Sequence, residues 1–224
     1  MLIDFRTLFP KYNIKPKGVC HVGGNKGEEF PVYMELGIKR QLWFEPNPEY
    51  FIKLSKTIAD NDEAIAMPYC LGEEDVDINF HISNNDGQSS SVLDLGTHLD
   101  VHPEVFFVKD IQVPMRRFDS IVTNGEQYDF LNIDTQGYEL HVLKGMGELL
   151  NNFKWAYLEV NKAELYKKCP LVEEVDEYLS YFGFERTETL WCGNTNWGDA
   201  LYIKNNFSDK DGNPIKMPYF DLTK

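Results

Sequence analysis

Three short apolar runs, separated by segments with helical spacing, constrain the fold of this chain most strongly. The runs are Gly18–Val22, Gln41–Phe44 and Ala64–Leu71, and each has the length of a buried strand. Between them, apolar residues recur at helical spacing over 28–36 and 50–58. Strands that alternate with helices predict a parallel sheet, because consecutive parallel strands need a crossover connection. The first seventy residues therefore predict an α/β fold.

The same alternation returns after residue 118. Apolar runs predict further strands, and two later segments have the periodicity of helices, one of them interrupted by Gly145 and Gly147. The last two strands should form an antiparallel pair at one edge of the sheet. The predicted strands are Asp119–Val122, Phe130–Asp134, Trp155–Val160, Phe184–Leu190 and Ala200–Ile203, and the predicted helices cover 140–149 and 172–182.

The 224 residues suit a single domain with modest insertions. Residues 1–16 are predicted to be a lead-in broken by two prolines, and Asp75–Ile82 alternates like an exposed strand. Residues 83–118 are irregular, and we expect them to form a lid that sets substrate specificity. The polar tail 205–224 should lie along the surface.

Composition narrows the range of partners. Hydrophobic residues make up 42% of the chain, enough for a substantial core, and the formal net charge is −14. An acidic surface repels phosphate backbones and anionic bilayers, so neither a nucleic acid nor a membrane is the expected partner. The oligomeric state stays open, a homo-oligomer included.

Metal binding and export are not expected either. The four cysteines lie far apart and form no Cys-x-x-Cys pair, so no zinc ribbon and no other metal site is predicted. The first residues contain no long apolar stretch that would serve as a signal peptide or membrane span. A cytoplasmic location is the default expectation.

The sharpest local feature is the segment His21–Gly27, which follows the first strand and opens a helix. Glycines there let the backbone turn tightly and approach a ligand, and helix N-terminal amides face an anionic group. Glu45 ends the next strand about 20 residues further on, where nucleotide-binding folds place an acid on ribose hydroxyls. A tight packing turn and a solvated strand-end acid are the plainer interpretations. Together the two features favour a nucleoside cofactor.

Three motifs carry a resemblance to a known family. They are His21–Gly27 (HVGGNKG), Phe44–Pro48 (FEPNP) and the longer block Ile133–Gly145 (IDTQGYELHVLKG). In these the chain resembles the FkbM-type methyltransferases over most of its length. Ser89–Ser91, Glu159–Asn161 with Glu164–Tyr166, and Trp197–Ala200 are similar to one branch of that family. His21 stands where the family usually has aspartate.

The resemblance implies a Rossmann-like class I methyltransferase fold, with a mostly parallel central sheet, an antiparallel edge strand and helices on both faces. It also implies S-adenosylmethionine as cofactor and a hydroxyl acceptor on a small molecule, with a sugar or glycan precursor as the expected class. Glu45 would bind the ribose, and residues near Cys70 and Leu71 would flank the adenine. The residues expected to hold the cofactor are His21, Gly23, Gly24, Asn25, Gly27, Glu45, Pro46, Cys70, Leu71 and Asp134.

Methyl transfer to a hydroxyl needs an aligned acceptor and a group that takes its proton. Asp134, after a buried strand, is the first candidate for the base, followed by Glu159 and His21. The alternatives are that Asp134 caps the next helix, that Glu159 pairs with a lysine and that His21 packs in the core. The residues expected to contact the acceptor are Ser90, Asn161, Trp197 and Asp199.

Two other functions compete with methyl transfer. A non-catalytic Rossmann-like binding protein would keep the fold without turnover, and a nicotinamide-dependent oxidoreductase would use a similar fold. The dinucleotide fingerprint is Gly-x-Gly-x-x-Gly, whereas this turn reads Gly-Gly-x-x-Gly. That register argues against the oxidoreductase.

Overall fold

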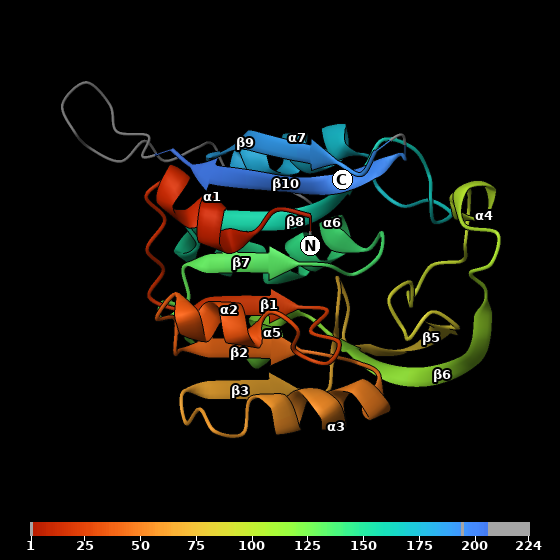
Figure 1. Ribbon diagram of the computed structural model, residues 1–224, viewed down its shortest axis with the longest axis horizontal. Coiled ribbons are helices and arrows are strands. Elements are labelled where there is room, and N and C mark those ends of the chain that lie inside the picture. Colours follow the sequence, from red (N-terminus) through yellow and green to blue (C-terminus); the bar gives the residue numbers. More distant parts are fainter. Residues whose placement is uncertain (1, 194, 206–224) are drawn as a thin grey trace.

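A seven-stranded sheet forms the centre of the computed structural model, which describes residues 2–193 and 195–205 (Figure 1). The strand order is β3-β2-β1-β7-β8-β10-β9, and β10 runs antiparallel to both of its neighbours. The other pairs are parallel, so the predicted α/β class with an antiparallel pair at one edge is confirmed. The strands are β1 (Val19–Val22), β2 (Gln41–Phe44), β3 (Ala64–Met67), β7 (Phe130–Ile133), β8 (Trp155–Asn161), β9 (Phe184–Trp191) and β10 (Trp197–Lys204).

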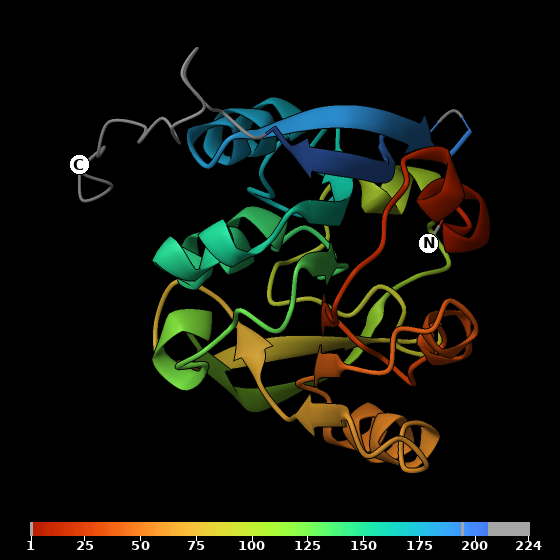
Figure 2. The same ribbon diagram turned by 90° about the vertical axis from the view of Figure 1, so that its left-hand side faces the viewer.

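Helices cover both faces of this sheet, as Figure 2 shows. The period of two in a strand separates two cores: Val19 and Trp43 pack with one helix layer, and Cys20 and Leu42 with the other. The first layer holds α1 (Phe5–Lys11), α2 (Phe30–Glu35) and α3 (Pro48–Thr57). The second holds α5 (Phe118–Ile121), α6 (Glu139–Met146), the 3₁₀-helix η1 (Gly147–Asn152) and α7 (Val172–Tyr181).

Four local predictions differ from the structure. Residues 83–118, predicted to be irregular, contain the ten-residue strand β6 (Phe107–Arg116), which the long-range pairing with Val76–Ser83 stabilises. The lead-in contains α1, which buries Phe5, Leu8 and Phe9 and has Pro10 in its last turn. The predicted third strand is split, because β3 ends before Pro68, which has no N–H to donate. The segment Asp119–Val122, predicted as a strand, instead belongs to the helix α5 and the residue that follows it. Phe118 and Val122 are both buried, and their separation of four residues is that of one helix face.

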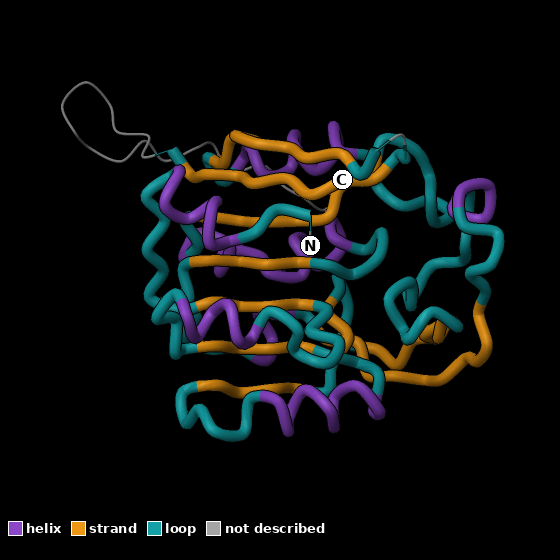
Figure 3. Tube along the Cα trace, viewed as in Figure 1, coloured by secondary structure: helices purple, strands orange, loops and turns teal. Residues whose placement is uncertain are grey.

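A second, three-stranded sheet lies beyond the carboxyl ends of the parallel strands (Figure 1). It contains β4 (Cys70–Leu71), β6 (Phe107–Arg116) and β5 (Val76–Ser83), the last being the predicted exposed strand. Residues 84–106 connect β5 to β6, and we call them the 84–106 segment. Apart from the short α4 (His98–Val101), the segment is mostly loop and turn, as Figure 3 shows.

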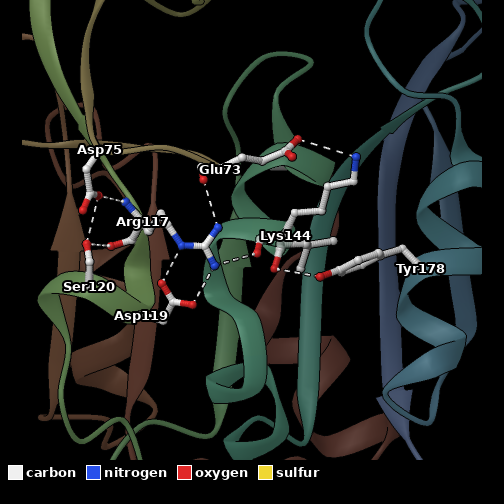
Figure 4. A network of polar contacts seen from close by, with 8 residues as sticks. Glu73, Asp75, Arg117, Asp119, Ser120, Lys144 and Tyr178 are labelled. Atoms are coloured by element: carbon white, nitrogen blue, oxygen red, sulfur yellow. Dashed lines mark hydrogen bonds and ion pairs between the residues drawn. The ribbon is translucent and has the colours of Figure 1, made fainter. Parts of the chain in front are cut away.

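Arg117 fixes the end of this second sheet to the main domain (Figure 4). Its guanidinium donates two hydrogen bonds to the Asp119 carboxylate, at 2.8 and 2.6 Å, and one to the Glu73 carbonyl at 2.9 Å. A longer bond of 3.5 Å reaches the Lys144 carbonyl in α6. One side chain therefore ties β6, the residue 73 turn and α6 together.

Two further predictions concern a membrane span and the C-terminal tail. In the part of the chain that the structure describes, no helix has both the length and the apolar character needed to cross a bilayer. The predicted surface tail, apart from residue 205, lies outside the described residues.

Candidate functional site

A cavity of about 660 Å³ lies where the parallel strands end and the 84–106 segment faces them. Its size falls within the range of small-molecule sites. Most of the predicted site residues line it, whereas Gly24, Gly27 and Asn161 do not. The predicted residues in its lining are His21, Gly23, Asn25, Glu45, Pro46, Cys70, Leu71, Ser90, Asp134, Glu159, Trp197 and Asp199.

The glycine turn brings β1 against its neighbours. Gly23 has φ +85°, and a Cβ there would lie 1.8 Å from the backbone oxygen of Asp134, so only glycine fits. The N–H groups of Gly23 and Gly24 both donate to the carbonyl of Phe44, at 3.0 and 2.9 Å. Gly24 and Gly27 pack against Leu54 of α3. Close packing against α3 therefore explains Gly24 and Gly27, whereas Gly23 lines the cavity.

Glu45 lies directly after β2, and only 5% of the residue is exposed. Its Oε2 accepts from the Asn25 N–H at 2.8 Å, and its Oε1 accepts from the Asn47 N–H at 2.7 Å. Burial raises the pKa of Glu45 to about 8. The Oδ1 of Asn25, beside it in the cavity lining, is buried without a hydrogen-bond partner. Glu45 is therefore not a solvated acid, and each of its oxygens keeps a lone pair for a ligand.

Gln136 joins the two predicted catalytic carboxylates. Its Nε2 donates to Oδ1 of Asp134 at 2.7 Å and to Oε2 of Glu159 at 2.9 Å, while its Oε1 accepts from the hydroxyl of Tyr166 at 2.7 Å. Burial raises the pKa of both acids, and for Glu159 the charge of Asp134 adds to the effect. The two groups therefore form one unit at the tips of β7 and β8.

The turn between β7 and α6 has its own acid. Oε1 of Glu139 accepts from the N–H groups of Thr135 and Gly137, at 2.9 and 3.1 Å. Glu139 thus satisfies backbone donors at the start of this helix, which is a structural role. The carboxylate of Asp134 is directed instead to Gln136 and the cavity.

His21 lies beneath the glycine turn. Its ring stacks on Trp43 at 4.4 Å, and its Nδ1 is 3.1 Å from the Tyr33 hydroxyl and 3.3 Å from the Asn132 amide nitrogen. Burial lowers the pKa of His21 to about 3, so the ring is neutral at physiological pH. These contacts are those of a core histidine with one edge at the cavity.

The residues predicted to contact the acceptor have different surroundings. Oδ2 of Asp199 accepts from the Tyr157 hydroxyl at 2.6 Å and from the Leu2 N–H, so this carboxylate also anchors the start of the chain. Ser90 Oγ accepts from the Ser83 N–H at 3.1 Å. Asn161 is buried at the end of β8, and its Oδ1 has no hydrogen-bond partner.

Sequence reasoning missed several cavity residues. Gln136 and Tyr166 stood within the quoted motifs without an assigned role, and only the fold shows that they meet. Glu29, whose pKa burial raises to about 7, and His98 also line the cavity. A second acid just after the glycine turn was the available signal for Glu29. His98, like His102 and His141, is only a weak candidate from the sequence, because the irregular segment around it has no spacing that would place the ring.

The charge of the lining separates candidate cofactors. Seven carboxylic acids line the cavity, and among the described lining residues there is neither lysine nor arginine. Such a site suits a cationic sulfonium better than a pyrophosphate, which binds to positively charged hydrogen-bond donors such as lysine and arginine. The Asn25 oxygen and the Glu45 carboxylate supply acceptors for amine and hydroxyl protons. The residues present thus fit S-adenosylmethionine.

Comparison with known proteins agrees with this geometry. Residues 21–186 match the family model described as a methyltransferase FkbM domain. The 2-O-methyltransferase NoeI of Sinorhizobium fredii is 28% identical over 173 residues, which cover 73% of this chain and 71% of that protein.

Two solved structures share the fold. The ribosomal protein L11 methylase of Lactobacillus delbrueckii subsp. bulgaricus has a TM-score of 0.52 at 11% identity, with 89% of this chain and 75% of that chain covered. The magnesium protoporphyrin IX methyltransferase of Synechocystis PCC 6803, solved with bound S-adenosylmethionine, has a TM-score of 0.50 at 10% identity, with 89% and 76% covered.

Proposed function

The chain belongs to the FkbM family of S-adenosylmethionine-dependent methyltransferases, and from this premise we propose that it methylates a hydroxyl group of a sugar or glycan precursor. The observation that carries the proposal is the convergence of Glu45, Asp134 and Glu159 on one cavity at the strand ends. The similarity to a 2-O-methyltransferase supports the hydroxyl as acceptor.

The first half of the cavity is the proposed cofactor site. The backbone around Gly23 and the side chain of Asn25 border this site. Glu45 accepts hydrogen bonds from the ribose hydroxyls, and Cys70 and Leu71 flank the adenine ring. When bound, S-adenosylmethionine supplies a methyl group on a sulfonium sulfur, a leaving group that needs no acid. The protein therefore has to align the acceptor oxygen, exclude water and remove one proton.

Asp134 and Glu159 are the proposed proton acceptor. Glu159 is buried and Asp134 partly buried, and one amide bridges the two carboxyls, so ionisation of one raises the pKa of the other. Such a pair titrates in two steps, so one carboxyl ionises before the other and can take the proton of the incoming hydroxyl. Gln136 donates to both and fixes their orientation. His21, neutral and hydrogen-bonded in the core, supports the strand ends.

Transfer of a labelled methyl group from S-adenosylmethionine to a panel of hexose and deoxyhexose glycosides tests the proposal. The expected product is a methyl ether, and Asp134→Asn and Glu159→Gln should each lower kcat by roughly 10²–10⁴. Asp110→Asn, a change at an exposed carboxylate outside the cavity lining, is the control. Methyl transfer that survives both cavity substitutions would exclude these residues as the base. Cofactor binding without any transfer would favour the non-catalytic alternative.

A further inference from the structure

The second half of the cavity is built by the 84–106 segment, whose first part is fixed to the rest of the molecule at three places. Oδ1 of Asp86 accepts from the Tyr50 hydroxyl at 3.3 Å, and the Gly96 N–H donates to the Leu165 carbonyl at 2.7 Å. In between, Ser91 Oγ donates to the Gln136 carbonyl at 2.8 Å. The segment therefore closes over the cavity beside the Asp134–Glu159 pair.

This half presents two kinds of surface. Amides and hydroxyls come from the segment, and an apolar wall with three aromatic side chains comes from the segment and from the elements around it. A saccharide has the same division, with hydroxyls at the ring edge and C–H groups on its faces. The polar lining residues are Asn84, Asn85, Gln88, Ser89 and Ser90, and the wall contains Phe80, Val92, Val105, Leu165, Tyr166 and Trp197.

The charge of the lining selects further. Glu104 belongs to this half, Asp134, Glu159 and Asp199 lie at its junction with the cofactor half, and no described lining residue is a lysine or arginine. Lys26, on the cofactor side, is held by Asp86 and does not line the cavity. A phosphate placed here would lose its water close to several carboxylic acids and without any cationic partner, which is strongly unfavourable. An uncharged ligand meets no such penalty.

His98 adds a specific contact. The residue lines the cavity, is 8% exposed and has an Nδ1 with no hydrogen-bond partner, while its Nε2 is 3.3 Å from Ser89 Oγ. Burial lowers the pKa of His98, so the ring is neutral and offers no positive charge. A buried polar atom without a partner is costly, and a ligand hydroxyl would satisfy it.

We propose that the 84–106 segment, Tyr166 and Trp197 form an acceptor subsite for an uncharged saccharide, in which Nδ1 of His98 hydrogen-bonds an acceptor hydroxyl. The proposal rests on the methyl-transfer function proposed above. It excludes sugar phosphates and nucleotide-linked sugars as acceptors. The methyl transfer would then come after the glycosyl transfer reaction, in which the sugar is released from its nucleoside diphosphate.

A competition between matched acceptors tests this subsite. Methyl glycosides of common hexoses and deoxyhexoses, their 6-phosphates where these exist, and the corresponding nucleotide-diphosphate sugars are offered to the full chain with labelled S-adenosylmethionine. Methylation of an uncharged glycoside, with kcat/KM at least about tenfold above its phosphorylated counterparts, is expected. Preference for a phosphorylated member, or no transfer to any uncharged member despite cofactor binding, overturns the proposal. Failure to bind the cofactor would overturn the proposed function itself.

Two variants separate the subsite from a general loss of structure. His98→Phe should raise the acceptor KM about tenfold with little change in kcat, and His98→Asn, whose amide can replace the ring nitrogen, should recover part of it. Glu104→Lys, at an exposed position, should raise kcat/KM for a 6-phosphate acceptor about tenfold. An unchanged KM in His98→Phe, or an unchanged phosphate preference in Glu104→Lys, contradicts the assignment.

Discussion

Glu45 has a structural role and also borders the proposed cofactor site. Its two oxygens accept backbone hydrogen bonds from Asn25 and Asn47, so the carboxylate closes the glycine turn onto the start of α3. The same carboxylate borders the cavity, where ribose hydroxyls are its expected partners. A residue that pre-forms the turn and also contacts the ligand spares the cofactor the cost of ordering that loop.

Replacing Glu45 with alanine should weaken binding of S-adenosylhomocysteine by about 1–3 kcal/mol, because the ribose hydroxyls lose their buried hydrogen-bond acceptor. Isothermal titration calorimetry measures this change directly. Glu49→Ala is the matched control, because Glu49 is an exposed acid in α3 outside the cavity lining. Equal affinities for the wild type and Glu45→Ala would show that the ribose lies elsewhere.

Gln136 should set the ionisation of the Asp134–Glu159 pair. Gln136→Met keeps the size of the side chain and removes the amide that donates to both carboxylates, so their pKa values should rise further. Carbon NMR titration of the side-chain carboxyls, which needs no acceptor, measures the shift. Gln112→Met, an exposed change on β6, should leave these titrations unaltered. A downward shift in Gln136→Met would contradict the bridging role.

At the scale of elements, the site depends on how closely β1 approaches β7. The turn after β1 passes the backbone of Asp134 so closely that there is no space for a Cβ at Gly23. That contact brings the glycine turn and the Asp134 carboxylate, the proposed cofactor and catalytic groups, into one cavity. The strand order, with β1 between β2 and β7, places Glu45 and Asp134 on either side of this turn.

Gly23→Ala and Gly37→Ala separate backbone strain from steric clash. Both glycines have positive φ, near +80°, but a Cβ at Gly37 meets nothing within 4 Å. Gly37→Ala should cost about 1–2 kcal/mol of unfolding free energy from strain alone. Gly23→Ala should cost about 1–3 kcal/mol more from overpacking and should abolish cofactor binding. Chemical denaturation measures both, and equal losses would contradict the close approach.

The sequence predicted the elements that repeat a pattern and missed those decided by tertiary contacts. Buried strands with flanking helices were readable, and so were the glycine turn and Glu45, because their chemistry is local. The helix α1 was missed because two prolines hid three residues that pack in the core. The Gln136 bridge and the orphaned nitrogen of His98 were not predictable, since each depends on chain segments far apart in the sequence.

At the scale of the whole molecule, this acidic protein holds several carboxylic acids in its interior, where burial raises their pKa values. Burial raises the pKa of Glu45 to about 8, and those of Glu29 and Glu139 to about 7. The folded state therefore binds these protons more tightly than the unfolded chain does. Stability from these groups is lost as pH rises through their folded pKa values.

The free protein should consequently lose stability as pH rises from about 4.5, the ordinary pKa of these acids, to about 8. Below about pH 6.5 His21 offsets part of this loss, because its depressed pKa makes the folded state bind fewer protons there than the unfolded chain does. Glu45→Gln, which cannot ionise, should reduce the decline between about pH 6.5 and 8 by about 1–2 kcal/mol. Denaturant unfolding across this range measures it. An equally steep decline in Glu45→Gln would show that Glu45 titrates normally.

A crystal structure with S-adenosylhomocysteine bound would show whether the cofactor lies across the ends of β1 and β2, between the Gly23 turn and Glu45. We expect ribose hydroxyls within hydrogen-bond distance of the Glu45 carboxylate and a sulfur that faces Asp134 and the 84–106 segment. A ligand bound elsewhere, or a ribose without contact to Glu45, would contradict this placement.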